Sequence, residues 1–145
     1  MGVADGGRDA AGDACVAKVA SHDLWILARV LEADDDALVV EDVDDDSRRR
    51  HTIYQRDALA LPRSADLETA LAVAAPGRRV FAMYPETTSF YEAVVTKPDP
   101  RRPPQHGDQS RFVQFDDDDP PDKVCDVPVR FTTVLPSDAY RFRAS

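Results

Sequence analysis

Three aromatic residues and one carboxylate stand at positions from which they could together bind a cation. Tyr84 and Tyr91 lie on either side of a Pro/Thr/Ser turn between two short apolar runs, so they can face each other across a hairpin. Phe115 ends a later apolar run, and Asp117 shares its face because strand side chains alternate with a period of two. A trimethylated ammonium keeps its charge but donates no hydrogen bond, so ring faces can replace water around it at about 0.5 to 2 kcal/mol each. The set predicts a pocket for a methylated ammonium.

Two aspartates in the first half form a second candidate group. Strand alternation places Asp42 and Asp44 on the same face as the apolar residues before them, so two carboxylates meet at a strand end. Such a pair is a good acceptor for an ammonium group, for example a chain amino terminus. Acidic runs are usually solvated turns, and we interpret residues 34–36 and 118–119 in that way.

Short apolar runs separated by acidic turns predict the strands that position these groups. The runs at residues 14–19, 24–31, 38–43 and 51–54 predict a small antiparallel barrel. Residues 64–75 predict a short helix, because Ser64 can cap it and Pro76-Gly77 can end it. Strand-like runs then resume at residues 80–84, 90–96, 111–116 and 124–134.

The second half repeats the first in the same order. Residues 25–30 align with 90–95, residues 40–42 with 113–115, and residues 61–62 with 135–136, which favours a duplication. The predicted fold class is therefore all-β, with two barrels joined by a short helix. We expect a disordered N-terminal tail at residues 1–13, a first barrel at 14–63, a helical connector at 64–78, a second barrel at 79–137 and a C-terminal tail at 138–145.

Composition and motif searches argue against several other functions. The 145 residues carry a formal net charge of -9 and a pI near 4.7, which disfavours direct nucleic-acid binding and favours basic partners. No apolar run approaches the roughly 20 residues of a membrane helix. The histidines lack metal-ligand spacing and no phosphate-binding loop occurs, so we predict no enzyme, no metal site and no cofactor. Cys15 and Cys125 lie among valines and are expected to be buried thiols.

These residues resemble the tandem Tudor domain of the SAGA-associated factor 29 family. The resemblance runs from about residue 14 to about residue 136. It is carried by residues 25–30 (WILARV), 40–44 (VEDVD), 50–52 (RHT), 59–62 (LALP), 80–91 (VFAMYPETTSFY) and 113–117 (VQFDD). The tyrosine hairpin is the longest and most specific of these motifs. The resemblance implies two packed SH3-like Tudor barrels.

The same resemblance implies a nuclear, non-enzymatic reader within a histone acetyltransferase complex. Its ligand would be the histone H3 amino-terminal tail with a di- or trimethylated lysine at the fourth position. On this resemblance, Tyr84, Tyr91 and Phe115 form the methyl-lysine cage with Asp117 beside it. The resemblance also implies that Asp42 and Asp44 hold the amino group of the first residue of the tail, and that Thr88 contacts the peptide.

Two other functions stay open at this point. A Tudor pocket for methylated arginine would need a narrow slot with parallel ring walls, and the sequence does not give ring angles. A structural adaptor would use the same aromatic residues as core, in which case Tyr84 and Tyr91 should be buried and their replacement should unfold the domain.

Overall fold

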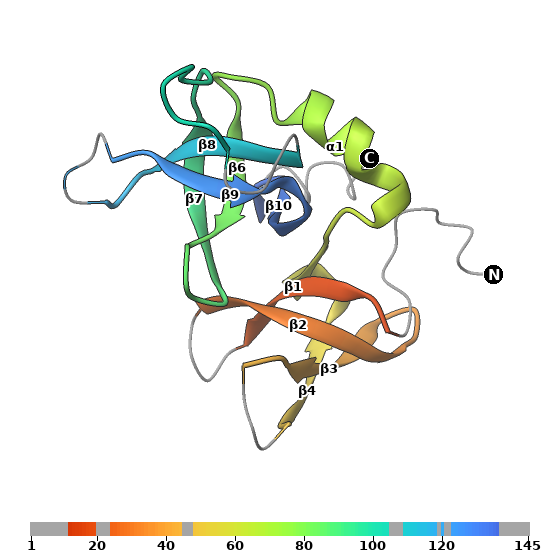
Figure 1. Ribbon diagram of the computed structural model, residues 1–145. Coiled ribbons are helices and arrows are strands. Elements are labelled where there is room, and N and C mark those ends of the chain that lie inside the picture. Colours follow the sequence, from red (N-terminus) through yellow and green to blue (C-terminus); the bar gives the residue numbers. More distant parts are fainter. Residues whose placement is uncertain are drawn as a thin grey trace. The chain divides into compact units, whose positions relative to one another are not determined.

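The computed structural model describes residues 12–19, 24–44, 48–104, 109–118, 120 and 123–136 (Figure 1). The chain divides into two compact units. The first unit comprises Met1–Ala60 and Thr88–Phe90, and the second comprises Leu61–Thr87 and Tyr91–Ser145. Apart from Gly12 and Asp13, the tails expected at residues 1–13 and 138–145 lie outside the described residues. The described structure is mostly β with one short helix, which confirms the predicted fold class.

The first unit is an antiparallel arrangement of five strands. They are β1 (Ala14–Val19), β2 (Leu24–Ala33), β3 (Ala37–Asp42), β4 (Arg50–Tyr54) and β5 (Ala58–Ala60). Strand β1 pairs with β2 and β5, while β3 pairs with β2 and β4. A register shift between Val30 and Glu32 bends β2, as a β-bulge does. The core alternates along the strands and contains Cys15, Ala17, Ala28, Val30, Leu38, Val40, Ile53 and Ala58.

A short segment from later in the chain completes the first unit. Phe90 and Ser89 pair with Trp25 and Ile26 of β2, and the Leu27 N–H donates to the carbonyl oxygen of Thr88 at 2.8 Å. The beginning of β7 (Ser89–Val95) therefore belongs to this unit, whereas Tyr91 and the residues after it belong to the second.

The second unit contains β6 (Arg79–Met83), the remainder of β7, β8 (Ser110–Phe115), β9 (Cys125–Pro128) and β10 (Thr132–Thr133). Strand β6 lies between β10 and β7, and β8 pairs with β7 and β9. A 3-10 turn at Val129–Phe131 connects β9 to β10. The core contains Ala74, Val80, Ala82, Ala93, Val95, Val113, Phe115, Cys125, Val127 and Val129.

The predicted helix is present as a 3-10 turn at Ser64–Asp66 followed by α1 (Leu67–Val73). Leu67, Ala70 and Leu71 pack against the core of the second unit, so the helix has an apolar face as its sequence indicated. The expected capping by Ser64 is wrong. Ser64 begins the 3-10 turn, and the Asp66 carboxylate instead accepts the backbone N–H of the preceding arginine at 3.3 Å.

The end of the helix is held by a side chain from the sheet. Arg111 on β8 donates from Nε to the Ala74 carbonyl at 3.0 Å and from Nη2 to the Leu71 carbonyl at 2.9 Å. These are carbonyls that a helix end leaves without intrahelical partners. Gly77 follows with φ of 92°, a conformation that few other residues adopt, and its N–H donates to the Val95 carbonyl at 2.8 Å. The helix is thus tied to the sheet of its own unit.

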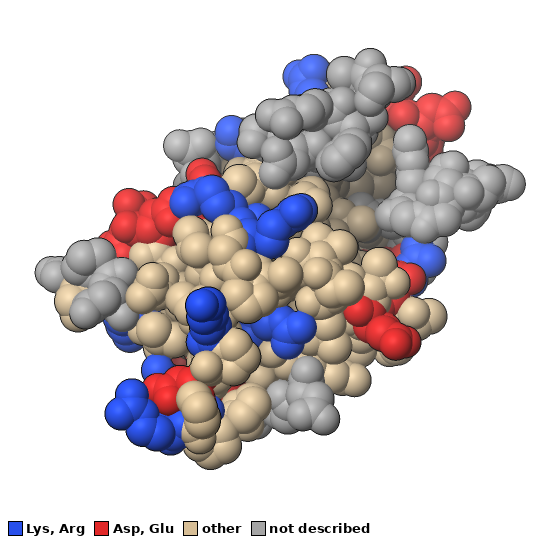
Figure 2. Space-filling model, turned by 90° about the horizontal axis from the view of Figure 1, so that it is seen from above, with Lys and Arg blue, Asp and Glu red and all other residues tan. Residues whose placement is uncertain are grey.

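Figure 2 shows one face of the molecule on which basic and acidic side chains both occur among uncharged ones. On this face the acidic side chains therefore do not form a continuous surface, although the chain carries a formal net charge of -9. Among the described residues, no helix is long and apolar enough to cross a membrane.

Candidate functional site

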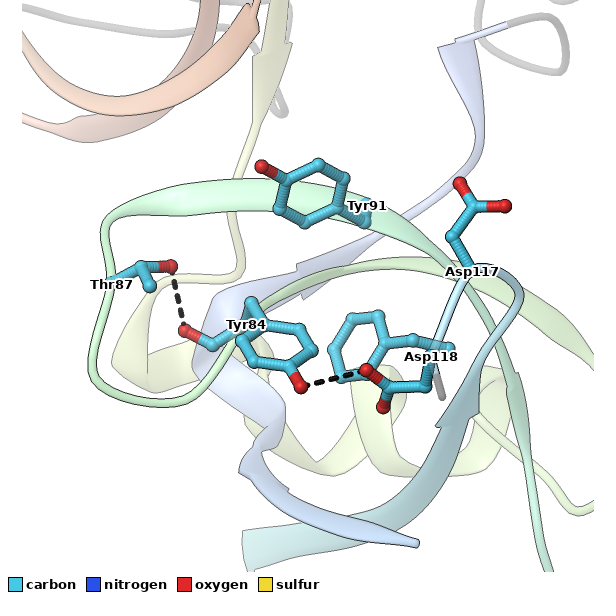
Figure 3. A pocket seen from close by; sticks show the side chains of 6 residues that line it. Tyr84, Thr87, Tyr91, Asp117 and Asp118 are labelled. Atoms are coloured by element: carbon cyan, nitrogen blue, oxygen red, sulfur yellow. Dashed lines mark hydrogen bonds between the residues drawn. The ribbon is translucent and has the colours of Figure 1, made fainter. Parts of the chain in front are cut away.

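Three aromatic rings of the second unit meet around a small pocket (Figure 3). The Tyr84 and Phe115 ring centroids are 4.8 Å apart with the planes tilted by 50°, and those of Tyr84 and Tyr91 are 6.3 Å apart with the planes at 90°. The pocket has a volume of about 260 Å³, below the roughly 300 to 1,000 Å³ of pockets for drug-sized ligands. Its lining consists of Tyr84, Thr87, Tyr91, Phe115, Asp117 and Asp118.

The three rings differ greatly in exposure. Phe115 is 2% exposed and belongs to the core, where it pairs across β7–β8 with Ala93. Tyr84 is partly buried and packs against that core, and Tyr91 is 40% exposed on β7. The pocket therefore has a buried floor and an exposed wall.

A tight turn fixes the backbone of Tyr84 at the end of β6. The Tyr84 carbonyl accepts both the backbone N–H of Thr87 at 3.1 Å and its hydroxyl at 2.9 Å, the latter drawn in Figure 3. Within this turn Glu86 has φ of 66°, a left-handed conformation that is uncommon for a residue other than glycine. The polar sequence after Tyr84 thus folds back on the residue that forms the pocket wall.

The position of Asp118 differs from what the sequence predicted for residues 118–119. We expected residues 118–119 to be a solvated turn, and residue 119 lies outside the described residues. Asp118 is instead partly buried, and its Oδ1 accepts the Tyr84 hydroxyl at 2.7 Å (Figure 3). The cause is a tight turn after β8, in which the Asp118 N–H donates to the Phe115 carbonyl at 3.3 Å. Asp117 is exposed at the rim of the pocket.

Lys123 is a second contact that the sequence did not indicate. Its Nζ donates to the Tyr84 hydroxyl oxygen at 3.2 Å. This hydrogen bond is the main cause that raises the pKa of Lys123. The only sequence signal for Asp118 and Lys123 was their closeness to Phe115 along the chain, which cannot specify a turn.

The acidic pair of the first unit lies at the end of β3. Leu38 and Val40 are buried on one face, as alternation predicts, and Asp42 is the last strand residue and partly buried. The expected continuation of this alternation to Asp44 is wrong because the strand ends at Asp42. Asp44 lies in the following turn, where its backbone N–H donates to Asp42 Oδ1 at 2.9 Å. The two aspartates are therefore adjacent, with Asp44 exposed.

Thr88 and Thr87 have different places in the structure. Thr88 is partly buried in the first unit and its carbonyl is engaged by β2, whereas Thr87 lines the pocket of the second unit. Among the residues that the structure describes, no group of three His, Cys, Asp or Glu side chains could hold a metal ion.

A mostly β module with an open aromatic pocket and carboxylates at its rim has the features of a binding domain for a cationic group. The family model of the SGF29 tudor-like domain matches residues 8–137, and the chain belongs to this family.

One similar protein is SAGA-associated factor 29kDa of Drosophila melanogaster. The two sequences are 34% identical over 97 residues, which cover 64% of this chain and 32% of the relative. The match thus spans about a third of the length of the curated relative. Among solved structures, the selenium-substituted SAWADEE domain of Arabidopsis thaliana SHH1 aligns over 87% of this chain and 98% of that chain, with a TM-score of 0.40 and 13% identity.

Proposed function

We propose that this chain is a reader of the histone H3 amino-terminal tail that binds a di- or trimethylated lysine at the fourth position. The methylated ammonium occupies the pocket of Tyr84, Tyr91 and Phe115, with Asp117 at its edge. The observation that carries the proposal is the meeting of three rings around a small pocket with an exposed carboxylate at its rim. Membership of the SGF29 tudor-like family supports it.

The ring geometry favours methylated lysine over methylated arginine. A planar guanidinium is best held between parallel aromatic faces, whereas a trimethylammonium group is nearly spherical and is best held by faces that point in different directions. The Tyr84 ring is perpendicular to Tyr91 and inclined by 50° to Phe115, so neither of these two ring pairs provides a parallel slot. The structural adaptor is disfavoured too, because Tyr91 is 40% exposed and does not belong to the core.

The free amino group of the tail binds at Asp42 and Asp44 in this proposal, and Thr88 contacts the peptide. Carboxylates accept charge-assisted hydrogen bonds from an ammonium group, each contributing about 1.5 to 3 kcal/mol. Asp42 Oδ1 already accepts the Asp44 backbone N–H, which orients the first carboxylate and leaves its second oxygen for a ligand. The acidic balance of the chain further favours a basic peptide.

The cellular setting is also part of the proposal. Similarity to a SAGA-associated factor supports a chromatin-targeting role in a SAGA-type histone acetyltransferase complex, and hence a nuclear location. The chain would supply the binding module, and other subunits would supply catalysis.

Calorimetric titration with four tail peptides tests this function. The peptides are trimethylated with a free amino terminus, trimethylated with an acetylated terminus, unmodified at lysine, and methylated at arginine instead. We expect a dissociation constant on the order of micromolar, about 8 kcal/mol, for the first peptide and weaker binding of the other three. Asp42→Asn should weaken all peptides with a free terminus, whatever their methylation. Equal binding of unmodified and trimethylated peptides would refute the proposed function.

A further inference from the structure

The hydroxyl of Tyr84 takes part in a chain of two hydrogen bonds, one with Lys123 and one with Asp118. Lys123 Nζ donates to the Tyr84 oxygen at 3.2 Å, and the Tyr84 hydroxyl donates to Asp118 Oδ1 at 2.7 Å. These three groups are called the Tyr84 clasp below. The clasp uses the one donor of the phenol and one of its acceptor positions. The hydroxyl is thus engaged by the protein itself, which leaves the ring face as the surface that Tyr84 offers to a ligand.

Lys123 lies off the hydroxyl edge of the ring and not over its face. Its Nζ is 5.5 Å from the ring centroid but only 3.2 Å from the hydroxyl oxygen. It is also absent from the residues that line the pocket. The lysine therefore holds Tyr84 without filling the space that a methylated ammonium would take.

Asp118 connects the clasp to the core of the second unit. Its backbone N–H bonds to the Phe115 carbonyl, and its Oδ2 lies 3.9 Å from Sγ of Cys125, a buried residue of β9. Tyr84 forms the wall of the pocket and Phe115 its floor, so Asp118 ties the wall to the floor. A phenol side chain without such a tie must be ordered when the ligand binds, which costs about two- to tenfold in affinity.

We propose that Asp118 and Lys123 are positioning residues that fix the Tyr84 ring in its binding orientation before the ligand arrives. This inference rests on the proposed function for its binding readout. Asp118 thus has a role different from that of Asp117, which is exposed at the pocket and makes no hydrogen bond to Tyr84 in this arrangement. The alternative is that Asp118 attracts the ligand by its charge alone.

A double-mutant cycle separates positioning from direct attraction. Tyr84→Phe keeps the ring and removes the hydroxyl through which Asp118 acts. We expect Asp118→Ala and Tyr84→Phe each to weaken binding of the trimethylated tail peptide by about two- to tenfold, and the double variant to bind no more weakly than the weaker single variant. Additive losses, or no loss in Asp118→Ala, would overturn the proposal. Asp35→Ala, an exposed aspartate of the first unit, controls for the change in net charge.

Lys123→Met should change the affinity for the trimethylated peptide in opposite directions, depending on whether Lys123 positions Tyr84 or acts only by its charge. Methionine keeps the length of the side chain but removes the charge and the donor. Loss of a positive charge near a cation pocket should tighten binding if only charge mattered. Positioning predicts weaker binding by about two- to tenfold, and tighter binding would overturn it. Lys97→Met, also an exposed lysine of the second unit, is the matched control.

A measurement without ligand distinguishes failure of the clasp from failure of the proposed function. Proton NMR of the free chain should show nuclear Overhauser contacts between the Tyr84 and Phe115 rings, whose centroids are 4.8 Å apart. We expect these contacts to weaken in Asp118→Ala and Lys123→Met while the amide spectrum stays dispersed. Unchanged ring contacts would overturn the clasp even if the peptide binds, and loss of the contacts would support it even if no peptide binds. If Asp118→Ala does not fold, the ring contacts and peptide affinities of Tyr84→Phe and Lys123→Met test the clasp instead.

Discussion

Replacement of Tyr91 by alanine should remove methyl-lysine selectivity and leave the fold intact. Tyr91 is 40% exposed and is not part of the buried core, so we expect a change in unfolding free energy within about 1 kcal/mol. The ring stands perpendicular to Tyr84 at 6.3 Å and forms one wall of the pocket. Loss of one ring-to-cation contact of about 0.5 to 2 kcal/mol corresponds to about 2- to 30-fold weaker binding of a trimethylated peptide.

The assay is calorimetric titration of wild type and Tyr91→Ala with trimethylated and unmodified tail peptides. The unmodified peptide, whose ammonium prefers water or hydrogen-bond acceptors, should change less than about twofold. Tyr91→Phe keeps the ring and should bind like the wild type. Tyr54→Ala is the matched control, because Tyr54 is a 60% exposed tyrosine of the first unit. Equal loss for both peptides, or the same loss in Tyr91→Phe, would refute the reasoning.

Four further predictions concern stability and reactivity. Phe115→Ala should destabilise the second unit by about 3 to 5 kcal/mol in urea unfolding, because it opens a cavity in the core. Arg111→Ala should cost about 1 to 3 kcal/mol in the same assay, since two carbonyls at the end of α1 lose their donor. Backbone hydrogen bonds lower the pKa of Asp34 in the folded chain below 3.8. The ionised carboxylate therefore stabilises the fold above pH 3.8, and this stabilisation is lost as the pH falls through the lower pKa of the folded state. Asp34→Asn should reduce this loss of unfolding free energy when urea unfolding is measured from about pH 5 to about pH 2. Burial raises the pKa of the Cys125 thiol, so thiol reagents at pH 8 should modify it far more slowly in the folded chain than in urea.

Sequence patterns predicted the features that local chemistry determines. Alternation of apolar residues predicted the strands, and the Pro76-Gly77 pair predicted the end of the helix, where Gly77 adopts the left-handed conformation. The tyrosine hairpin was visible because a polar turn separates two apolar runs, and the structure brings its two rings to 6.3 Å. These are short-range signals, which a single sequence contains.

Features that depend on where a strand ends could not be predicted in the same way. Alternation suggested that Asp44 continues the face of Asp42, but the strand stops at Asp42, whose side chain accepts a turn hydrogen bond. The sequence favoured a solvated turn at Asp118. In the structure its backbone N–H donates to the Phe115 carbonyl, and its carboxylate accepts the Tyr84 hydroxyl. In both cases a single turn hydrogen bond accompanies the position of the side chain, and neither the composition nor the strand pattern indicates that bond.

The exposure of the three rings determines how binding and stability can be separated by mutation. Tyr91 is exposed, so its loss should affect the ligand and not the fold. Phe115 is core, so its loss should affect both and cannot by itself demonstrate a binding role. Tyr84 is intermediate: its ring packs on the core while its hydroxyl is held by Asp118 and Lys123. If Asp118 and Lys123 position the ring as proposed, Tyr84→Phe should release the ring without removing it, which makes the hydroxyl of Tyr84 the most discriminating single group at which to test a preformed pocket.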